Sequence, residues 1–173
     1  MTTGLTYSAV GATCVSDPVW TVVPPGYRCV ERTTRIGQGL ECWDVTTAAI
    51  GQWTIKTRSG FSVQPAADGE LAVREEQDYT LLAELGPCTL REPVRVVAVV
   101  ARPDRRGFAY GTRQGHPVSG EEAFVVHRTP DGAVWLTIRS MTRPGRGLWR
   151  LAFPAVLVAQ RWYRRRYQRA LVP

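Results

Sequence analysis

Alternation of apolar and polar residues dominates the middle of the chain, from residue 61 to residue 140. Such a period of two is typical of half-buried strands. It predicts strands at residues 61–64, 71–75, 79–84, 94–101, 108–113, 122–127 and 133–140. The 94–101 segment is almost continuously apolar, which predicts a strand buried on both faces. The sequence Pro130-Asp131-Gly132 predicts a hairpin turn between the last two strands.

Spacings of three and four residues mark two helices on either side of this region. Residues 41–53 form the first, and residues 148–171 form a long C-terminal one. One face of the first helix would carry Leu40, Trp43, Thr47 and Ile50. Pro154 should start or kink the long helix, because proline lacks the N–H that a helix interior uses. Short strands are predicted at 7–13 and 28–36, separated by a proline-rich loop at 17–27.

The long helix has small residues on one face, which bears on what lies beneath it. Alanines and tyrosines recur there at steps of three and four, at Ala152, Ala155, Ala159, Tyr163 and Tyr167. They either leave space under the helix or pack closely against bulky sheet residues. The element order predicts an α+β fold in which a curved antiparallel sheet grips the C-terminal helix, as one domain spanning residues 1–173. Cavities between such a sheet and helix are common ligand sites.

Charge is distributed unevenly along the chain. The net charge is +7, yet no acidic residue follows Asp131, and the nine arginines after it make that part +9. A basic segment of this kind can bind nucleic acid, an anionic membrane or an acidic protein. Nucleic acid is disfavoured because no known nucleic-acid-binding motif is present. The alternative is an arginine-rich codon bias, since Lys56 is the only lysine among 22 basic residues.

Several classes of protein are disfavoured by what the sequence lacks. It shows neither a recognisable secretory leader nor an apolar run long enough to span a membrane, so we expect a cytoplasmic protein. Four widely spaced cysteines, two histidines and no acidic cluster favour free buried thiols and argue against a metal site. The short GQG at residues 37–39 lacks the context of a dinucleotide-binding motif, and we expect no cofactor.

The segment at residues 107–124, GFAYGTRQGHPVSGEEAF, concentrates the candidate chemistry. His116, between a glycine and a proline, could transfer protons or simply cap its loop. Glu121 and Glu122 would point to opposite faces of a strand, so they cannot act as a pair. One could be a buried acid or base, or could form an ion pair with an arginine. Tyr110 could orient a substrate oxygen. These four residues are the candidate catalytic groups.

Residues near this segment are candidates for binding a substrate. Phe108 and Thr112 share a strand face with Tyr110. Arg143, before a proline, could bind an anionic group or hold a turn. The full set of candidate substrate-binding residues is Phe108, Thr112, Arg113, Trp135, Arg143 and Tyr163.

These motifs resemble the DUF1990 (UPF0548) family of bacteria and plants. The similarity rests on YSAVGAT at 7–13, IGQG at 36–39, AAIGQW at 48–53 and, above all, FAYGTRQGHPVSGEEAF at 108–124. It continues through DGAVW at 131–135, Arg143-Pro144 and residues 154–167. The chain departs from the family pattern at Arg113-Gln114, where an apolar residue and proline are usual, and at Thr142, where serine is common. The element order suggests an affinity with helix-grip folds of the START and Bet v 1 type.

Three functions follow as hypotheses. The first is an enzyme without cofactor that cyclises or isomerises an apolar polyketide- or terpenoid-like substrate by acid–base chemistry, as in secondary metabolism. The second is a non-catalytic carrier of a hydrophobic, lipid-like ligand. The third is a basic module that binds a membrane surface through its arginine-rich helix.

Overall fold

The computed structural model describes residues 4–66, 71–85, 88–145, 147 and 149–172. In this part of the chain, seven antiparallel strands form one sheet in the order β1-β7-β6-β5-β4-β3-β2. The strands are β1 (Arg28–Gln38), β2 (Phe61–Pro65), β3 (Asp78–Leu85), β4 (Cys88–Arg102), β5 (Arg105–Thr112), β6 (Val118–Arg128) and β7 (Ala133–Pro144). The helices are α1 (Gly39–Ile50), α2 (Thr54–Thr57) and α3 (Trp149–Ala170).

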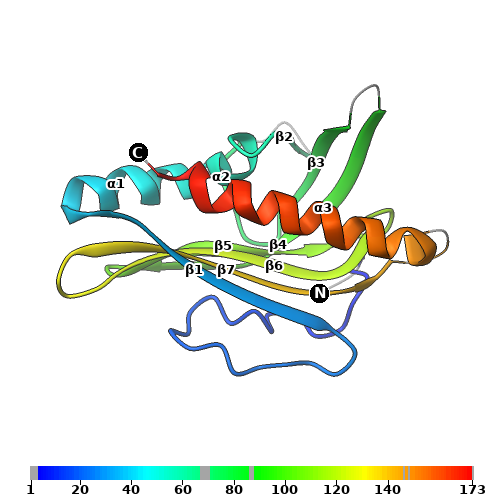
Figure 1. Cartoon of the computed structure of the whole chain (residues 1–173), viewed down its shortest axis with the longest axis horizontal. Helices are drawn as coiled ribbons and strands as arrows, with labels where there is room; N and C mark the ends of the chain where they lie inside the picture. Colours follow the sequence, from blue (N-terminus) through cyan, green and yellow to red (C-terminus); the bar gives the residue numbers. More distant parts are fainter. Residues whose placement is uncertain (1–3, 67–70, 86–87, 146, 148, 173) are drawn as a thin grey trace.

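The helices lie on one face of the curved sheet, and the segment before β1 lies on the other (Figure 1). Helix α3 runs along the inner face, as the predicted helix-grip arrangement requires. The larger core fills the space between the sheet and the helices. A smaller cluster on the outer face, around Val15, Val100 and Ala123, is covered by the N-terminal segment. Sheet residues therefore alternate between two buried environments, which explains why the central strands contain so few exposed positions.

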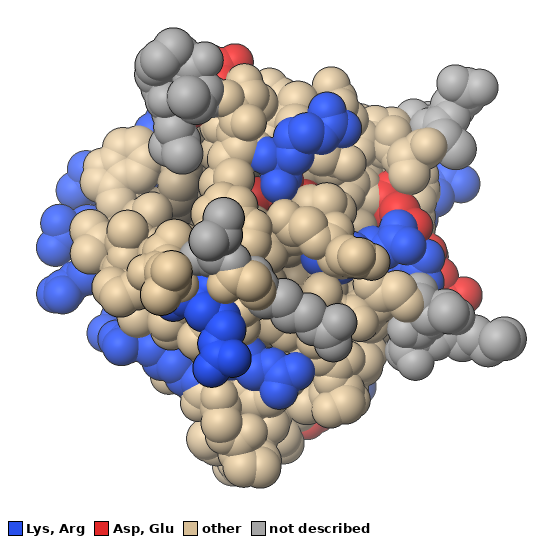
Figure 2. Space-filling model, turned by 90° about the vertical axis from the view of Figure 1, so that its right-hand side faces the viewer, with Lys and Arg blue, Asp and Glu red and all other residues tan. Residues whose placement is uncertain are grey.

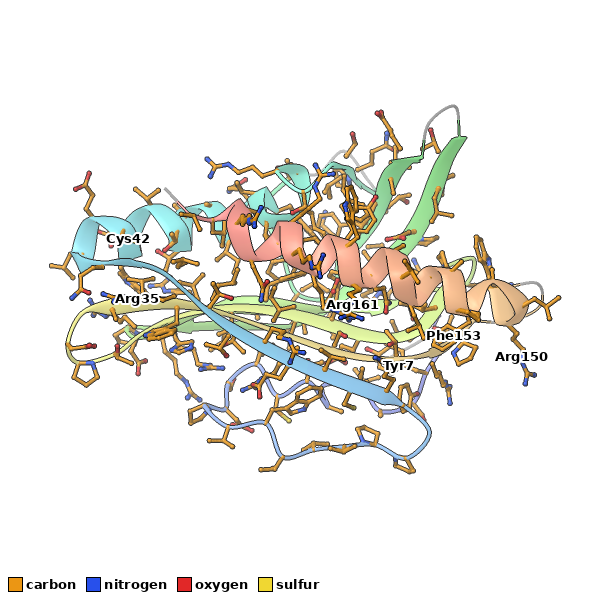
Figure 3. All side chains as sticks on the ribbon, viewed as in Figure 1. Tyr7, Arg35, Cys42, Arg150, Phe153 and Arg161 are labelled. Carbon is orange, nitrogen blue, oxygen red and sulfur yellow. The ribbon has the colours of Figure 1, made fainter. Side chains whose placement is uncertain are left out.

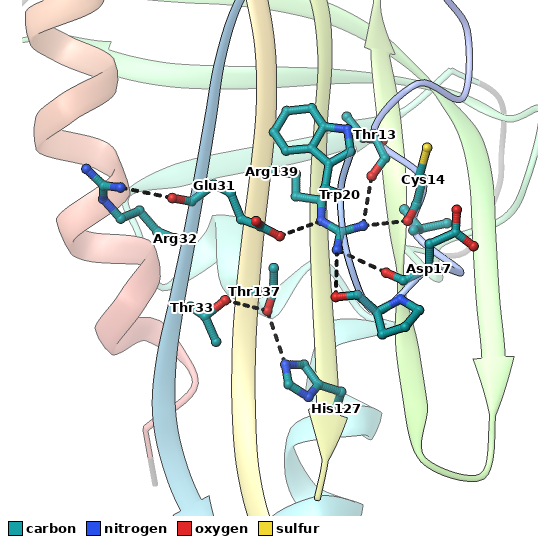
Figure 4. A network of polar contacts seen from close by, with 12 residues as sticks. Thr13, Cys14, Asp17, Trp20, Glu31, Arg32, Thr33, His127, Thr137 and Arg139 are labelled. Atoms are coloured by element: carbon teal, nitrogen blue, oxygen red, sulfur yellow. Dashed lines mark hydrogen bonds and ion pairs between the residues drawn. The ribbon is translucent and has the colours of Figure 1, made fainter. Parts of the chain in front are cut away.

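The N-terminal segment is held to the outer face by a buried arginine. Arg139 of β7 is fully buried, and its guanidinium donates to Glu31 Oε1 at 2.9 Å (Figure 4). It also donates to backbone carbonyls at residues 13, 14, 17 and 18. Five N–H donors in a planar fork suit this role, since a loop without regular structure presents unpaired carbonyls.

Several local predictions were wrong, each for a tertiary reason. Residues 7–13 form turns, not a strand, because their backbone N–H groups turn toward a carboxylate on the outer face. The described residues 71–75 also lie outside any strand. Leu40 is 68% exposed, so it does not belong to the buried face of α1. Val99 is 40% exposed, which corrects the prediction that its whole strand is buried on both faces.

The long helix and the cysteines also differ in detail from the prediction. Helix α3 begins at Trp149, so Pro154 lies inside it and does not start it. Cys14, Cys29 and Cys42 are free thiols, as expected, but they are partly exposed. The side chain of Cys88 lies outside the described part of the structure.

Candidate functional site

A cavity of about 290 Å³ lies between the inner face of the sheet and α3. Its helix side is lined by the alanine and tyrosine face that the spacing identified, namely Ala152, Ala155, Ala159, Tyr163 and Tyr167. The small alanine side chains leave the space beneath α3 open at this level. The volume lies just below the range that is usual for small-molecule sites, which is about 300–1,000 Å³.

One end of the cavity holds the only lysine of the chain, buried among aromatic rings. Trp53 adopts a left-handed conformation with φ of 58°, and α2 starts directly after it. This sharp entry turns Lys56 inward, where it is 1% exposed. Its Nζ lies 4.5–5.2 Å from the ring centres of Phe61, Tyr110, Phe124 and Tyr167. An ammonium at such distances is attracted to each ring face.

The lysine is paired with a carboxylate from the sheet. Lys56 Nζ donates to Glu122 Oε2 at 2.9 Å and to the hydroxyl oxygen of Tyr167 at 2.6 Å. The hydroxyl group of Tyr110 donates a hydrogen bond to the same Glu122 oxygen. Four residues from α2, β5, β6 and α3 thus form one hydrogen-bonded group on the cavity wall, called here the Lys56 cluster.

The two tyrosines of the Lys56 cluster remain protonated. Burial, and next the negative charge of Glu122, raise the pKa of Tyr110 and the pKa of Tyr167 well above their ordinary values. Each phenol therefore stays neutral and keeps its proton available for a hydrogen bond. The cluster combines a buried cation, a carboxylate and neutral donors, which is a suitable setting for acid–base chemistry.

A second carboxyl group lines the same cavity from β4. Burial raises the pKa of Glu92 to about 7, with Lys56 acting to lower it and Glu122 to raise it. Glu92 Oε2 lies 3.7 Å from Nε2 of His116. Glu122, by contrast, is held by the ammonium of Lys56. Two carboxyl groups in one cavity with such different surroundings can take different protonation states, the usual basis for separate acid and base roles.

His116 lies on the loop between β5 and β6, as predicted, and lines the cavity. Burial, followed by the positive charge of Lys56, lowers its pKa to about 3. The ring is therefore neutral near pH 7, and its contact with Glu92 is not an ion pair. Nδ1 accepts a hydrogen bond from the backbone N–H of Val118 at 3.1 Å, so the ring proton resides on Nε2, facing Glu92. His116 therefore both caps its loop and lines the cavity.

We expect Glu92→Gln to change how stability depends on pH. In the unfolded chain this carboxyl titrates near 4.5, whereas in the fold it keeps its proton up to about pH 7. The contribution of this carboxyl to the free energy of unfolding is thus greatest at low pH. It falls by about 3 kcal/mol in total as the pH rises from about 4.5 through about 7. His116 acts in the opposite sense, because its depressed pKa makes stability fall as the pH drops below about 6.5.

Urea unfolding of the wild type and of Glu92→Gln at about pH 5 and about pH 8 separates the contribution of Glu92 from that of His116, which both proteins share. The free energy of unfolding of Glu92→Gln should rise relative to that of the wild type by about 2.5 kcal/mol between the two pH values. Glu84→Gln, at an exposed position of β3, is the matched control. Parallel pH curves for Glu92→Gln and the wild type would contradict the assignment.

The two adjacent glutamates of β6 face opposite sides of the sheet, as predicted. The Glu121 carboxylate accepts hydrogen bonds from Tyr7 Oη at 2.7 Å and from the backbone N–H groups of Gly11 and Thr13 at 2.8 and 3.1 Å. Thr13 Oγ1 donates to it as well. These donors all belong to the N-terminal segment on the outer face. The carboxylate is thus bound by the segment on the outer face, and Glu121 is also among the residues that line the cavity. Its catalytic role stays a prediction.

The structure brings only part of the predicted substrate-binding set to the cavity. Thr112 and Tyr163 line it. Phe108 lies beside it in the core, where its ring packs on Trp53 with centroids 4.7 Å apart. Thr112 also holds the β5–β6 connection together, because its Oγ1 accepts a hydrogen bond from the N–H of Gly120.

The other three predicted residues do not line the cavity. Arg113 forms an ion pair with Asp78. Arg143 donates to Ser119 and to the carbonyl of Thr6, and it stacks on Tyr27 at 4.8 Å. It therefore holds the N-terminal segment, whereas the alternative predicted for it was to hold a turn. Trp135 alternates with the inward-facing Leu136 and shares a face with Arg139, which places it on the outer side. His127 also lies there, 3.1 Å from Thr137 (Figure 4).

Lys56, Glu92 and Tyr167 were not among the site residues predicted from the sequence. Lys56 has one signal in the sequence, because it is the only lysine of an arginine-rich chain, but codon bias explains that equally well. Glu92 lies in a segment with several charges, and nothing in its spacing marks it. Only the packing of β4, α2 and α3 around one cavity brings the three together.

The described residues contain no group of three or more histidine, cysteine, aspartate or glutamate side chains placed to hold a metal ion. Within the same part of the chain, no helix is both long and apolar enough to cross a membrane.

Comparison with solved structures places this fold among helix-grip proteins. Norcoclaurine synthase from Thalictrum flavum, a point mutant in complex with a transition-state analogue, superimposes with a TM-score of 0.56 at 10% identity, over 87% of this chain and 96% of that one. The Zhui aromatase/cyclase from Streptomyces sp. R1128 gives a TM-score of 0.55 at 15% identity, over 84% and 92%. At these identities the likeness concerns the fold alone.

Comparison of sequences identifies the family. A UPF0548 protein of Deinococcus radiodurans is 34% identical over 162 residues, which cover 86% of this chain and 79% of that protein. The model of the DUF1990 family, described as a domain of unknown function, matches residues 6–170. The match includes the N-terminal segment, the Lys56 cluster and α3, and the chain therefore belongs to the DUF1990 (UPF0548) family.

Proposed function

We propose that this protein is a cofactor-independent enzyme that isomerises or cyclises an apolar, carbonyl-bearing small molecule, of the polyketide or terpenoid kind, in the cavity under α3. One observation carries the proposal: a buried lysine, paired with a partly buried glutamate and bonded with it to two tyrosines, forms part of the wall of a largely apolar cavity. Removing two charges from water is costly, and a site that only had to hold a hydrophobic ligand would not need it.

The arrangement supports a proton transfer between two carbons of the substrate. The Glu122 carboxylate takes a proton from a carbon next to the carbonyl, and the Lys56 ammonium donates a hydrogen bond to the oxygen that becomes negative. Glu92, protonated near neutral pH, returns a proton at a second carbon. The double bond moves and the substrate keeps its composition, while exchange with solvent restores both carboxyl groups. His116 Nε2 faces Glu92 and orients it.

A carrier of hydrophobic ligands is the second candidate. It is favoured by the aromatic and alanine lining, where the rings of Phe61 and Tyr163 pack with centroids 4.5 Å apart. The two functions differ in what the Lys56 cluster does. In a carrier, the cluster fixes the shape of the cavity and no bond changes.

Conversion of a β,γ-unsaturated ketone to its conjugated isomer, followed by ultraviolet absorbance, tests the enzyme hypothesis. We expect Glu122→Gln to lower the kcat of this reaction by about 10²–10⁴-fold, because its amide cannot accept the proton, while ligand affinity changes little. Ala159→Phe should abolish binding and turnover together, because it fills the space under α3. Ala48→Phe, at an exposed position of α1, is the matched control and should change neither.

The outcomes separate the two functions. Ligand binding that Ala159→Phe removes, without conversion of any unsaturated ketone by the wild type, would make the protein a carrier. Equal turnover by Glu122→Gln and the wild type would show that the carboxylate is not the base.

A further inference from the structure

The outer side of α3 carries apolar side chains in contact with solvent. Leu151, Val158 and Trp162 are 81%, 71% and 51% exposed. They are spaced by seven and four residues, so they form one narrow stripe along the helix. Leu151 and Val158 are the two most exposed large apolar residues among the described ones. Here they are called the α3 stripe.

The same helix is strongly basic. It carries Arg150, Arg161, Arg164, Arg165, Arg166 and Arg169 and no acidic residue. Arg150 extends away from the body at the beginning of α3, and Arg161 lies on the helix farther along (Figure 3). Arg28 and Arg32 of β1 add to this charge, because their charges help to lower the pKa of Arg164, after the larger effect of burial. Figure 2 shows several basic side chains along the left edge of this face and others across its middle, while the acidic side chains visible there are fewer.

Apolar and cationic groups combined on one exposed helix match the chemistry of an anionic lipid surface. Helices that lie in a membrane interface have tryptophan and leucine on the side facing the acyl chains and arginines that reach the phosphates. Nucleic acid would use the arginines but would leave Leu151 and Val158 in water. An acidic protein partner would need a matched apolar groove as well.

We propose that α3 docks this protein on anionic lipid bilayers, with the α3 stripe in the interface and its arginines on the lipid phosphates. Ala155 and Ala159, which are exposed and also line the cavity, lie on the same helix. Docking would therefore bring one edge of the cavity to the bilayer, where apolar molecules dissolve. This surface is separate from the Lys56 cluster, and its role holds for an enzyme and for a carrier alike.

Flotation of the full chain with vesicles tests the proposal. Vesicles of phosphatidylcholine alone are compared with vesicles that contain about 30 mol% phosphatidylglycerol. We expect binding to the anionic vesicles, at least about tenfold weaker for Leu151→Ser/Val158→Ser, because two apolar contacts with the interface are lost. Arg161→Gln/Arg165→Gln should weaken binding to a similar degree, and raising the salt from about 0.1 M to about 0.5 M should weaken it too.

Two matched controls keep the experiment specific. Val23→Ser replaces an apolar residue that is 69% exposed in the N-terminal loop, and Arg106→Gln replaces an exposed arginine of β5; neither should change binding. Unchanged thermal unfolding of the α3 variants shows that they are folded. Absence of binding to the anionic vesicles would overturn the proposal, as would equal binding to both vesicle types. It would also be overturned by undiminished binding of both α3 double variants, or by a dimer or a DNA complex that uses the α3 stripe in place of lipid.

Discussion

Replacement of Lys56 by methionine is expected to lower the free energy of unfolding by about 2–4 kcal/mol, since it leaves the partly buried Glu122 carboxylate without its cation. Methionine has a similar length and is uncharged, so the cavity keeps its shape while the ion pair and the hydrogen bond to Tyr167 are lost. The aromatic rings that surround Nζ lose their contact with an ammonium as well. Guanidinium unfolding at neutral pH measures the loss. The same variant should be inactive if the proposed enzyme function is correct.

A double-mutant cycle distinguishes loss of the pair from loss of packing. Because Glu122→Gln removes the unpaired charge, Lys56→Met/Glu122→Gln should be more stable than the sum of the two single effects predicts, by about 1–3 kcal/mol. Thr57→Met, at the next residue and exposed, is the matched control and should change stability by less than about 0.5 kcal/mol. Additive single effects would show that the two charges do not stabilise each other.

Glu121→Ala is expected to cost about 3–5 kcal/mol, because it leaves several buried donors of the N-terminal segment unpaired. Tyr7 Oη and the N–H groups of Gly11 and Thr13 all donate to this carboxylate. Burial and then the Glu121 charge raise the pKa of Tyr7 well above its ordinary value, so the phenol stays protonated and is a donor at any working pH. Chemical unfolding measures the cost, and limited proteolysis should show earlier cleavage in the segment before β1.

Glu84→Ala, at an exposed position of β3, is the matched control and should leave both measurements unchanged. Tyr7→Phe should cost about 1–2 kcal/mol in the wild type and much less in Glu121→Ala, because its hydrogen-bond partner is then already absent. Proteolysis of Glu121→Ala at the wild-type rate would contradict the view that this carboxylate holds the N-terminal segment.

These two glutamates show how one strand serves both faces of the sheet. Glu121 binds the segment that covers the outer face, and Glu122 takes part in the Lys56 cluster on the inner face. Because the two residues are adjacent on the strand, Glu121 has a structural role on one face and Glu122 is available for chemistry on the other. A substitution at either position therefore reports on a different part of the molecule.

Periodicity along the chain was enough to predict most of the sheet and the long helix. Alternation identified β2 to β7 in outline, and the hairpin turn at residues 130–132 joins β6 and β7 as expected. Steps of three and four identified the face of α3 that lines the cavity. The predicted strand at 7–13 failed because the backbone of this segment bonds to Glu121, a partner more than a hundred residues away.

Within the site, the sequence by itself determined that His116, Tyr110 and one of the two glutamates lie in one strand–loop–strand segment, and that Glu121 and Glu122 face opposite sides of the sheet. The tertiary structure decided that Glu122 is the one beside Tyr110. Only the tertiary structure added Lys56, Glu92 and Tyr167, which lie on three other elements. It also removed Arg113, Arg143 and Trp135 from the cavity, because their partners are on the outer side or at the sheet surface. Local pattern reflects which side of an element is buried. Which buried groups meet across a cavity depends on how distant elements pack.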